Sequence, residues 1–258
     1  MSKCSMARAL DMASVYIDRR VDSGSRLAIT LPHAMHILIV AASAALITKM
    51  IKKHKDASLD EERAFVAGLL HDSGRYIVDE KEAGYPHPIA GYDRCIKLHA
   101  ASVAPICLTH AILDKATVEE YPDYTDEQLK FVNDKMSTLT RSFYDDLIML
   151  VDLHCRGDQV LPIQERLNKN KNFYNIKSQD YCEKYLKLYS QFTQKYDVDI
   201  YAVCRFVAEH KASIFRQYMP YCHGWLRYVC GDKTVADEYM SYLKNPQVLD
   251  QWRSYLGR

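Results

Sequence analysis

The stretch Gly68-Leu69-Leu70-His71-Asp72-Ser73-Gly74-Arg75 contains the residue types with the clearest chemistry in the chain. His71 can offer a neutral imidazole nitrogen and Asp72 a carboxylate, and this pair suits a divalent transition metal. Gly74 permits the left-handed conformation that ends many helices. The guanidinium of Arg75 presents a fork of donors suited to a phosphate. Two adjacent ligands do not make a site, so other parts of the chain must supply the rest.

Further candidate ligands lie on both sides of this pair. They are two histidines of an upstream apolar helix, two downstream histidines and one aspartate: His33, His36, His87, His110 and Asp152. A carboxylate within the apolar run Leu147–Leu153 is costly to bury unless it is paired, protonated or bound to a metal. The alternative is that Asp152 lies on a polar helix face, because Asp145 and Asp146 belong to the same predicted helix.

The elements that must position these residues have helical periodicity throughout. Pro32 suits the first turn of a helix that follows a loop at 21–30, and Ser58 with Glu61 fits a capping box at the start of the next helix. Alternating strand-like runs separated by hairpin turns are missing from the sequence, so we expect an all-α fold. The expected helices span residues 4–19, 32–52, 59–72, 88–98, 103–113, 125–136, 138–155, 180–196, 200–219 and 235–243.

Composition restricts the class of protein. Hydrophobic residues make up 48% of the 258 residues, which is enough for a sizeable core. Lys plus Arg (34) nearly balances Asp plus Glu (33), so there is no strong signal for nucleic-acid binding. The eight cysteines form no C-x-x-C pair, and we interpret them as reduced thiols of a cytoplasmic protein, with a Cys222–Cys230 bridge as the alternative. The apolar helix at 34–51 is expected to be buried and not to span a membrane.

Taken together, the ordered set His36, His71-Asp72, His87-x-x-x-Gly91, Thr109-His110 and Asp152 resembles the ligand series of the HD-domain superfamily of metal-dependent phosphohydrolases. The surroundings are similar too: His36-x-x-x-Val40-Ala41-x-x-Ala44 resembles the first-histidine helix of that superfamily. Leu69 to Arg75 resembles its Leu-Leu-His-Asp-Ile-Gly-Lys motif, with Ser73 and Arg75 as departures. The resemblance covers roughly residues 10–157. His99 and His33 are the alternative ligands to His110, because the interval from His110 to Asp152 is long for this superfamily.

The resemblance implies an HD-domain-like helical bundle with an additional helical C-terminal region. We therefore predict an HD-type metal-binding domain at 1–157 and a helical extension at 158–258 that serves as a cap, a dimer surface or a small subdomain. It also implies that His36, His71, Asp72 and Asp152 hold one metal, while His87 and His110 hold a second that Asp72 bridges. Mixed nitrogen and oxygen ligands favour Mn, Fe, Ni, Co or Zn, with one or two ions per chain.

The implied activity is hydrolysis of a nucleotide or another small phosphoester by a metal-activated water. Asp72 and Arg75 are the predicted catalytic residues. Arg75 would contact the phosphate, and Arg94 could do so too, although a surface salt bridge is the simpler interpretation of Arg94. Two alternatives stay open: a di-iron oxygenase of the HD type, which uses the same ligands, and a regulatory module that binds a nucleotide without turnover. An oligomer is compatible with the sequence.

Overall fold

The computed structural model describes residues 5, 8–9, 12–13, 27–76, 86–114, 124–178 and 180–216. Several predictions fall outside these residues, wholly or in large part. They are the helices at 4–19 and 235–243, most of the loop at 21–30 and the Cys222–Cys230 alternative.

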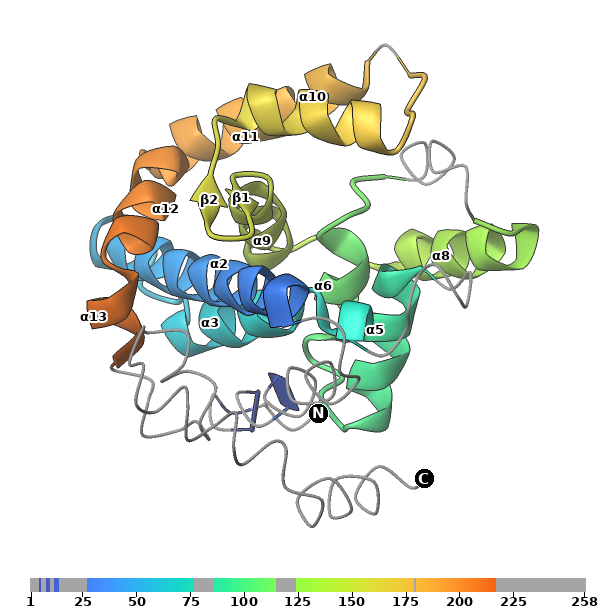
Figure 1. Ribbon diagram of the computed structural model, residues 1–258, viewed down its shortest axis with the longest axis horizontal. Coiled ribbons are helices and arrows are strands. Elements are labelled where there is room, and N and C mark those ends of the chain that lie inside the picture. Colours follow the sequence, from blue (N-terminus) through green and yellow to red (C-terminus); the bar gives the residue numbers. More distant parts are fainter. Residues whose placement is uncertain are drawn as a thin grey trace.

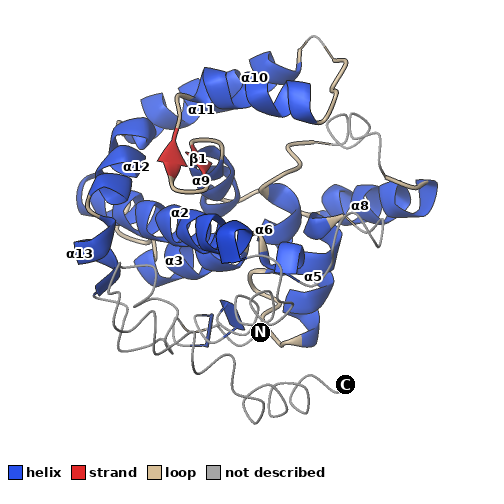
Figure 2. Cartoon of the chain, viewed as in Figure 1, coloured by secondary structure: helices blue, strands red, loops and turns tan. Residues whose placement is uncertain are grey.

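The described residues form an all-α fold, as predicted, together with one very small hairpin that the sequence did not predict (Figure 2). Figure 1 shows α2 and α3 side by side below the hairpin, with α10 and α11 across the opposite side of the molecule. The elements in chain order are α2 (Leu27–His54), α3 (Glu61–Leu70), η1 (Ser73–Tyr76), α5 (His87–Lys97), α6 (Ala104–Thr109), α8 (Asp126–Thr138), α9 (Phe143–Asp152), β1 (Cys155–Arg156), β2 (Gln159–Val160), α10 (Ile163–Phe173), α11 (Tyr181–Tyr196), α12 (Ile200–Glu209) and α13 (Lys211–Arg216).

Helix α2 is the central helix of the main core, because it is apolar on nearly all sides and is packed accordingly. By length and composition alone the segment His33–His54 could cross a membrane, but 78% of its most apolar window is buried inside the protein. The expectation of a buried helix is therefore confirmed. Its start was predicted wrongly: α2 begins at Leu27 instead of Pro32. A proline inside a helix removes one N–H donor, and this helix continues through that loss.

Helix α3 packs against α2 through small residues. A Cβ atom added at Gly68 would lie 2.6 Å from the Cα of Ala41, so glycine is what lets the two backbones come this close. The predicted capping box at Ser58 is wrong. The cap is Asp60, whose carboxylate accepts a hydrogen bond from the backbone N–H of Arg63, while the Ser58 hydroxyl donates to Asp56 at 2.6 Å. Serine and aspartate both cap helices well, and Asp60 is the cap here because it directly precedes the first helical residue.

Gly74 has a different role from the predicted left-handed turn. Among the described glycines only Gly157 has a positive φ, of 61°, and Gly74 lies in the 3₁₀ helix η1. A Cβ atom at Gly74 would lie 1.8 Å from the carbonyl oxygen of His87 and 2.6 Å from the backbone nitrogen of Gly91. Gly74 therefore allows α5 to pack directly against η1, and this packing brings His87 close to Asp72.

Two hydrophobic clusters support the fold. The main core joins α2, α3, α9, α11 and α12, with buried residues such as Ile37, Phe65 and Leu150. A smaller satellite cluster joins α5, the α6 end and α8, and consists of Ile89, Leu108, Ile112 and Val132. Helix α8 begins where it was predicted to begin. Its N-cap is Thr125, which forms a capping box with Gln128.

Helix α9 is shorter than the predicted 138–155 helix, since it begins after Ser142 and ends at Asp152. Asp145 is not on a polar face, as the sequence suggested, but is buried. Its carboxylate accepts hydrogen bonds from the Thr109 hydroxyl at 2.6 Å and the Ser142 backbone N–H at 2.7 Å. This contact ties the residue before His110 to α9.

The chain after α9 turns through a two-residue hairpin and enters α10. Arg156 pairs with Gln159 across the turn, which Gly157 makes possible by its positive φ. The helices expected from the sequence did not include α10. The predicted 200–219 helix is divided at His210 into α12 and α13, and α12 packs against α2. The boundary at residue 157 between two domains stays a prediction.

The cysteines that the structure describes are free, in agreement with the prediction: Cys95, Cys107, Cys155, Cys182 and Cys204.

Candidate metal centre

The end of α3 fixes the orientation of His71. Leu70 is the last helical residue, and His71 is completely buried one position beyond it. The Nδ1 of His71 lies 2.6 Å from the carbonyl oxygen of Gly68. A carbonyl can only accept, so Nδ1 carries the proton and Nε2 keeps a free lone pair that points into the site.

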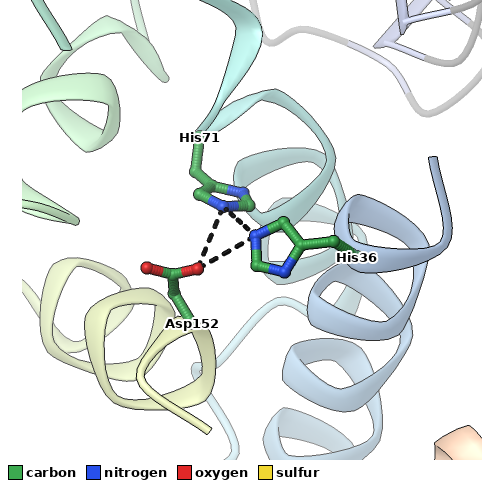
Figure 3. A group of neighbouring side chains, drawn as sticks. All are labelled: His36, His71 and Asp152. Carbon is green, nitrogen blue, oxygen red and sulfur yellow. Dashed lines mark hydrogen bonds and ion pairs between the residues drawn. The ribbon is translucent and has the colours of Figure 1, made fainter. Parts of the chain in front are cut away.

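A first group of possible metal ligands forms around this nitrogen: His36 from α2, His71 from the end of α3 and Asp152 from the end of α9 (Figure 3). The Nε2 of His36 lies 3.0 Å from Oδ1 of Asp152 and 3.2 Å from Nε2 of His71. The Nε2 of His71 lies 3.5 Å from the same aspartate oxygen. Three residues widely separated in sequence therefore direct their donor atoms at one small volume.

A second group consists of Asp72, His87 and His110. The Nε2 atoms of His87 and His110 lie 3.3 and 3.4 Å from Oδ1 of Asp72, and 3.4 Å from each other. The Nδ1 of His110 lies 3.1 Å from the carbonyl oxygen of Ile106, so this imidazole too keeps its Nε2 lone pair for the site. His99 belongs to neither group and is exposed, with a φ of 56°.

Asp72 connects the two groups. Its Oδ1 faces the second group, while its Oδ2 lies 3.6 Å from Nε2 of His36 and 3.8 Å from Nε2 of His71. Among the described residues Oδ1 has no hydrogen-bond donor, although it is buried. A buried carboxylate oxygen with imidazole nitrogens on its open side is the arrangement that a cation would complete.

The electrostatics of the groups favour a cation. Burial would raise the pKa of Asp72, but Arg75 and His71 hold it well below its usual range. Burial would likewise raise the pKa of Asp152, and His36 and His71 keep it well below that range. Burial would lower the pKa of His71, yet Asp72 and Asp152 raise it. Two ionised carboxylates thus attract positive charge to the imidazole nitrogens.

The residues therefore fit a divalent metal. Each group offers two imidazole nitrogens and one carboxylate oxygen, the mixed donor set that transition metals accept, and Asp72 can contribute an oxygen to both groups.

Arg75 and His33 flank Asp72 on the open side. The Nε of Arg75 donates to Oδ2 of Asp72 at 2.8 Å, and the Nε2 of His33 lies 3.4 Å from the same oxygen. Burial lowers the pKa of His33 to about 3, so this imidazole is neutral. Arg94 is half-buried on α5 and is not among the described residues that line the cavity beside the site.

A cavity of about 240 Å³ opens beside the first group. One wall consists of His33, His36, Asp72, Arg75 and Asp152. The opposite wall comes from the hairpin and α10, where no functional residue had been predicted. Its polar and aromatic residues are Arg156, Arg166, Lys169, Asn170, Phe173 and Tyr174. For the four of them on α10, the sequence signal was their spacing, which places them on one face of the helix.

The comparison with known families agrees with this geometry. Residues 34–134 match the family model of the HD domain, and this part of the chain belongs to the HD-domain superfamily. The superfamily is one of metal-dependent phosphohydrolases, and its domains bind divalent metals. The match includes His36, His71, Asp72, His87 and His110 and ends before Asp152. No curated protein and no solved structure matches the chain.

Proposed function

We propose that the protein hydrolyses a phosphate ester or anhydride bond of a nucleotide or another small phosphorylated metabolite, with one or two divalent transition metals held by the two groups. The observation that carries the proposal is the position of Asp72, which turns one carboxylate oxygen toward each group. Two donor groups that share a carboxylate are the arrangement that phosphate-cleaving metal sites use.

When bound, a divalent cation would polarise the phosphoryl oxygens and acidify a water molecule. The chain supplies the rest. His71 and His110 are held in the tautomer that leaves Nε2 free, because backbone carbonyls accept their Nδ1 protons. Arg75 lines the cavity with its Nε fixed on Asp72, so its guanidinium can bind a phosphate oxygen beside the metal groups. The neutral His33 can hydrogen-bond substrate or water without adding charge.

The test begins with protein purified without a metal-binding tag. Elemental analysis is expected to find one or two transition-metal ions per chain. A panel of phosphomonoesters, nucleotides and phosphoanhydrides is then assayed with Mn²⁺, Fe²⁺, Co²⁺, Ni²⁺ and Zn²⁺, and we expect release of phosphate or pyrophosphate. Asp72→Ala should abolish this activity. Asp134→Ala is the matched control, since Asp134 lies on the exposed surface of α8 in an ion pair with Lys130.

Two results would contradict the proposal. Oxygen consumption together with a mixed-valent iron signal, in place of hydrolysis, would assign the same ligands to the di-iron oxygenase alternative. Tight nucleotide binding that persists in Asp72→Ala, without product from any substrate, would favour the regulatory module. The cytoplasmic location, a small phosphorylated partner and the lack of a membrane partner stay predictions.

A further inference from the structure

Helix α10 presents one face to the cavity. Arg166, Lys169, Asn170 and Phe173 are spaced three and four residues apart, so they lie along one side of the helix, and all four line the cavity. Figure 1 shows α10 beyond the hairpin, on the far side from α3 and α5. This face lies outside the residues that match the HD-domain family model.

Arg166 is held in place but is not neutralised. Its Nη1 donates to the side-chain oxygen of Asn170 at 2.7 Å, which fixes the guanidinium plane. Its Nε is buried and has no hydrogen-bond partner among the described residues. Buried donors of this kind are normally satisfied, so the structure leaves a place for an acceptor at Arg166.

The charges along this wall are mostly positive. Lys169 pairs with Glu165 at 2.7 Å, and no described residue forms an ion pair with Arg156 or Arg166. The two carboxylates that line the cavity, Asp72 and Asp152, both face the histidines of the metal groups. An anionic group would therefore find, on the wall opposite the metal groups, two guanidinium groups that form no ion pair with a described residue.

We propose that Arg166 and Arg156, with Lys169 beside them, form a second phosphate-binding subsite, so that the substrate is a small molecule with two phosphate groups. This inference rests on the proposed function, which places the reacting phosphate at Asp72 and Arg75. The second phosphate then binds on the α10 side of the same cavity. Planar guanidinium groups suit phosphate because they donate two parallel hydrogen bonds to it.

The size and rim of the cavity restrict the organic part of the substrate. About 240 Å³ is small beside the roughly 300–1,000 Å³ of pockets for drug-sized ligands. Phe173 is 80% exposed at the rim, edge-to-face with Tyr174 at 4.9 Å between ring centroids. A sugar or a base that extends from the cavity would pack against this aromatic edge.

Matched pairs of ligands that differ by one phosphate test the subsite. Suitable pairs are ribose 5-phosphate with ribose 1,5-bisphosphate, and adenosine 5′-monophosphate with adenosine 3′,5′-bisphosphate. Calorimetric titration of the chelator-treated protein measures binding without turnover. We expect at least one bisphosphate to bind roughly tenfold or more tightly than its monophosphate, and Arg166→Gln to remove this difference. In assays with added metal, Arg166→Gln should raise the KM for the bisphosphate by a similar factor and change kcat little.

Arg205→Gln is the charge-matched control, because Arg205 lies exposed on α12 in an ion pair with Glu209. Should Arg166→Gln fail to fold, as judged by circular dichroism, the exposed Arg156→Gln gives the same readout. Equal affinities within every pair, or an equal loss for both members of a pair in Arg166→Gln, would overturn the subsite. Bisphosphate preference without any hydrolysis would keep the subsite and reject the proposed function. Hydrolysis without a preference for the bisphosphate would keep the proposed function and reject the subsite.

Discussion

The first and second groups of possible metal ligands lie side by side, but different parts of the molecule support them. His36 and Asp152 of the first group come from α2 and α9, which belong to the large main core. His87 and His110 of the second group come from α5 and the end of α6. These elements reach the main core through Cys95, Ile106 and Cys107, and the satellite cluster of Ile89, Leu108, Ile112 and Val132 supports them as well. Asp72 and the contact at Gly74 connect the two.

This difference implies unequal robustness. A ligand on the main core keeps its place when one buried residue is altered, because many others hold the same helix. The second group relies in addition on a satellite cluster with only four buried apolar residues among those described, and on one backbone contact with η1. We therefore expect most substitutions to remove the ion of the second group before that of the first. Asp72, which faces both groups, is the exception.

The largest effect is expected for Asp72→Ala, because this carboxylate faces both groups. The bound metal should fall toward zero per chain, and kcat/KM should fall by roughly 10³-fold or more, about 4 kcal/mol of transition-state stabilisation. Elemental analysis and steady-state kinetics measure the two effects. Retention of one tightly held ion would show that the groups are more independent than their geometry indicates.

Gly74→Ala should separate the groups through the backbone. The added methyl would lie 1.8 Å from the His87 carbonyl oxygen, so α5 must move away from η1. We expect a loss of about 3 kcal/mol in the free energy of unfolding and loss of the second ion, while the first stays bound. Urea denaturation and metal counting test this. Gly157→Ala is a useful contrast. An alanine is strained at the positive φ of this position, so the variant should destabilise the hairpin without disturbing α5.

His110→Ala should remove one ion and leave the fold intact. The expected metal content is one ion per chain, with activity lowered by roughly 10²-fold if the second ion takes part in the reaction. His99→Ala, in the exposed turn after α5, is the control. Unchanged activity with one ion lost would make the protein a single-metal enzyme.

The smallest effect is expected from Ile112→Val in the satellite cluster. Loss of one buried methylene should cost about 1 kcal/mol of stability and weaken binding of the second ion by about twofold to threefold. Ile39→Val in the main core is the matched variant, with the same chemistry and the same complete burial. It should lose similar stability without a change in metal affinity. Equal affinity losses would remove the distinction between the two supports.

The first group could be predicted from the sequence because its residues contrast with their surroundings. His36 and Asp152 interrupt apolar runs, and a polar group within a buried helix calls for a partner. The same rule could not assign Asp145, which is buried for another reason: it accepts hydrogen bonds from Thr109 and Ser142. Pattern alone does not separate a polar residue that binds a ligand from one that locks two helices together.

Gly74 and α10 show where prediction from sequence stops. A glycine serves both for left-handed turns and for close backbone contacts, and only the position of α5 decides between them. Helix α10 buries just Ile163 and Leu167, so it lacks the apolar stripe that identifies a helix in sequence. Apart from the exposed Phe173, its remaining residues are polar, because they line the cavity or face solvent.

The two-residue turn at Gly157 has a practical consequence for engineering. Only ten positions separate Asp152, at the end of α9, from the beginning of α10, and the hairpin occupies the middle of that interval. In the two proposals made above, the groups that break the bond and the groups that select the ligand therefore occupy consecutive stretches of one chain. Grafting a different segment in place of residues 155–174 should change which compounds are accepted while the histidines and aspartates stay untouched.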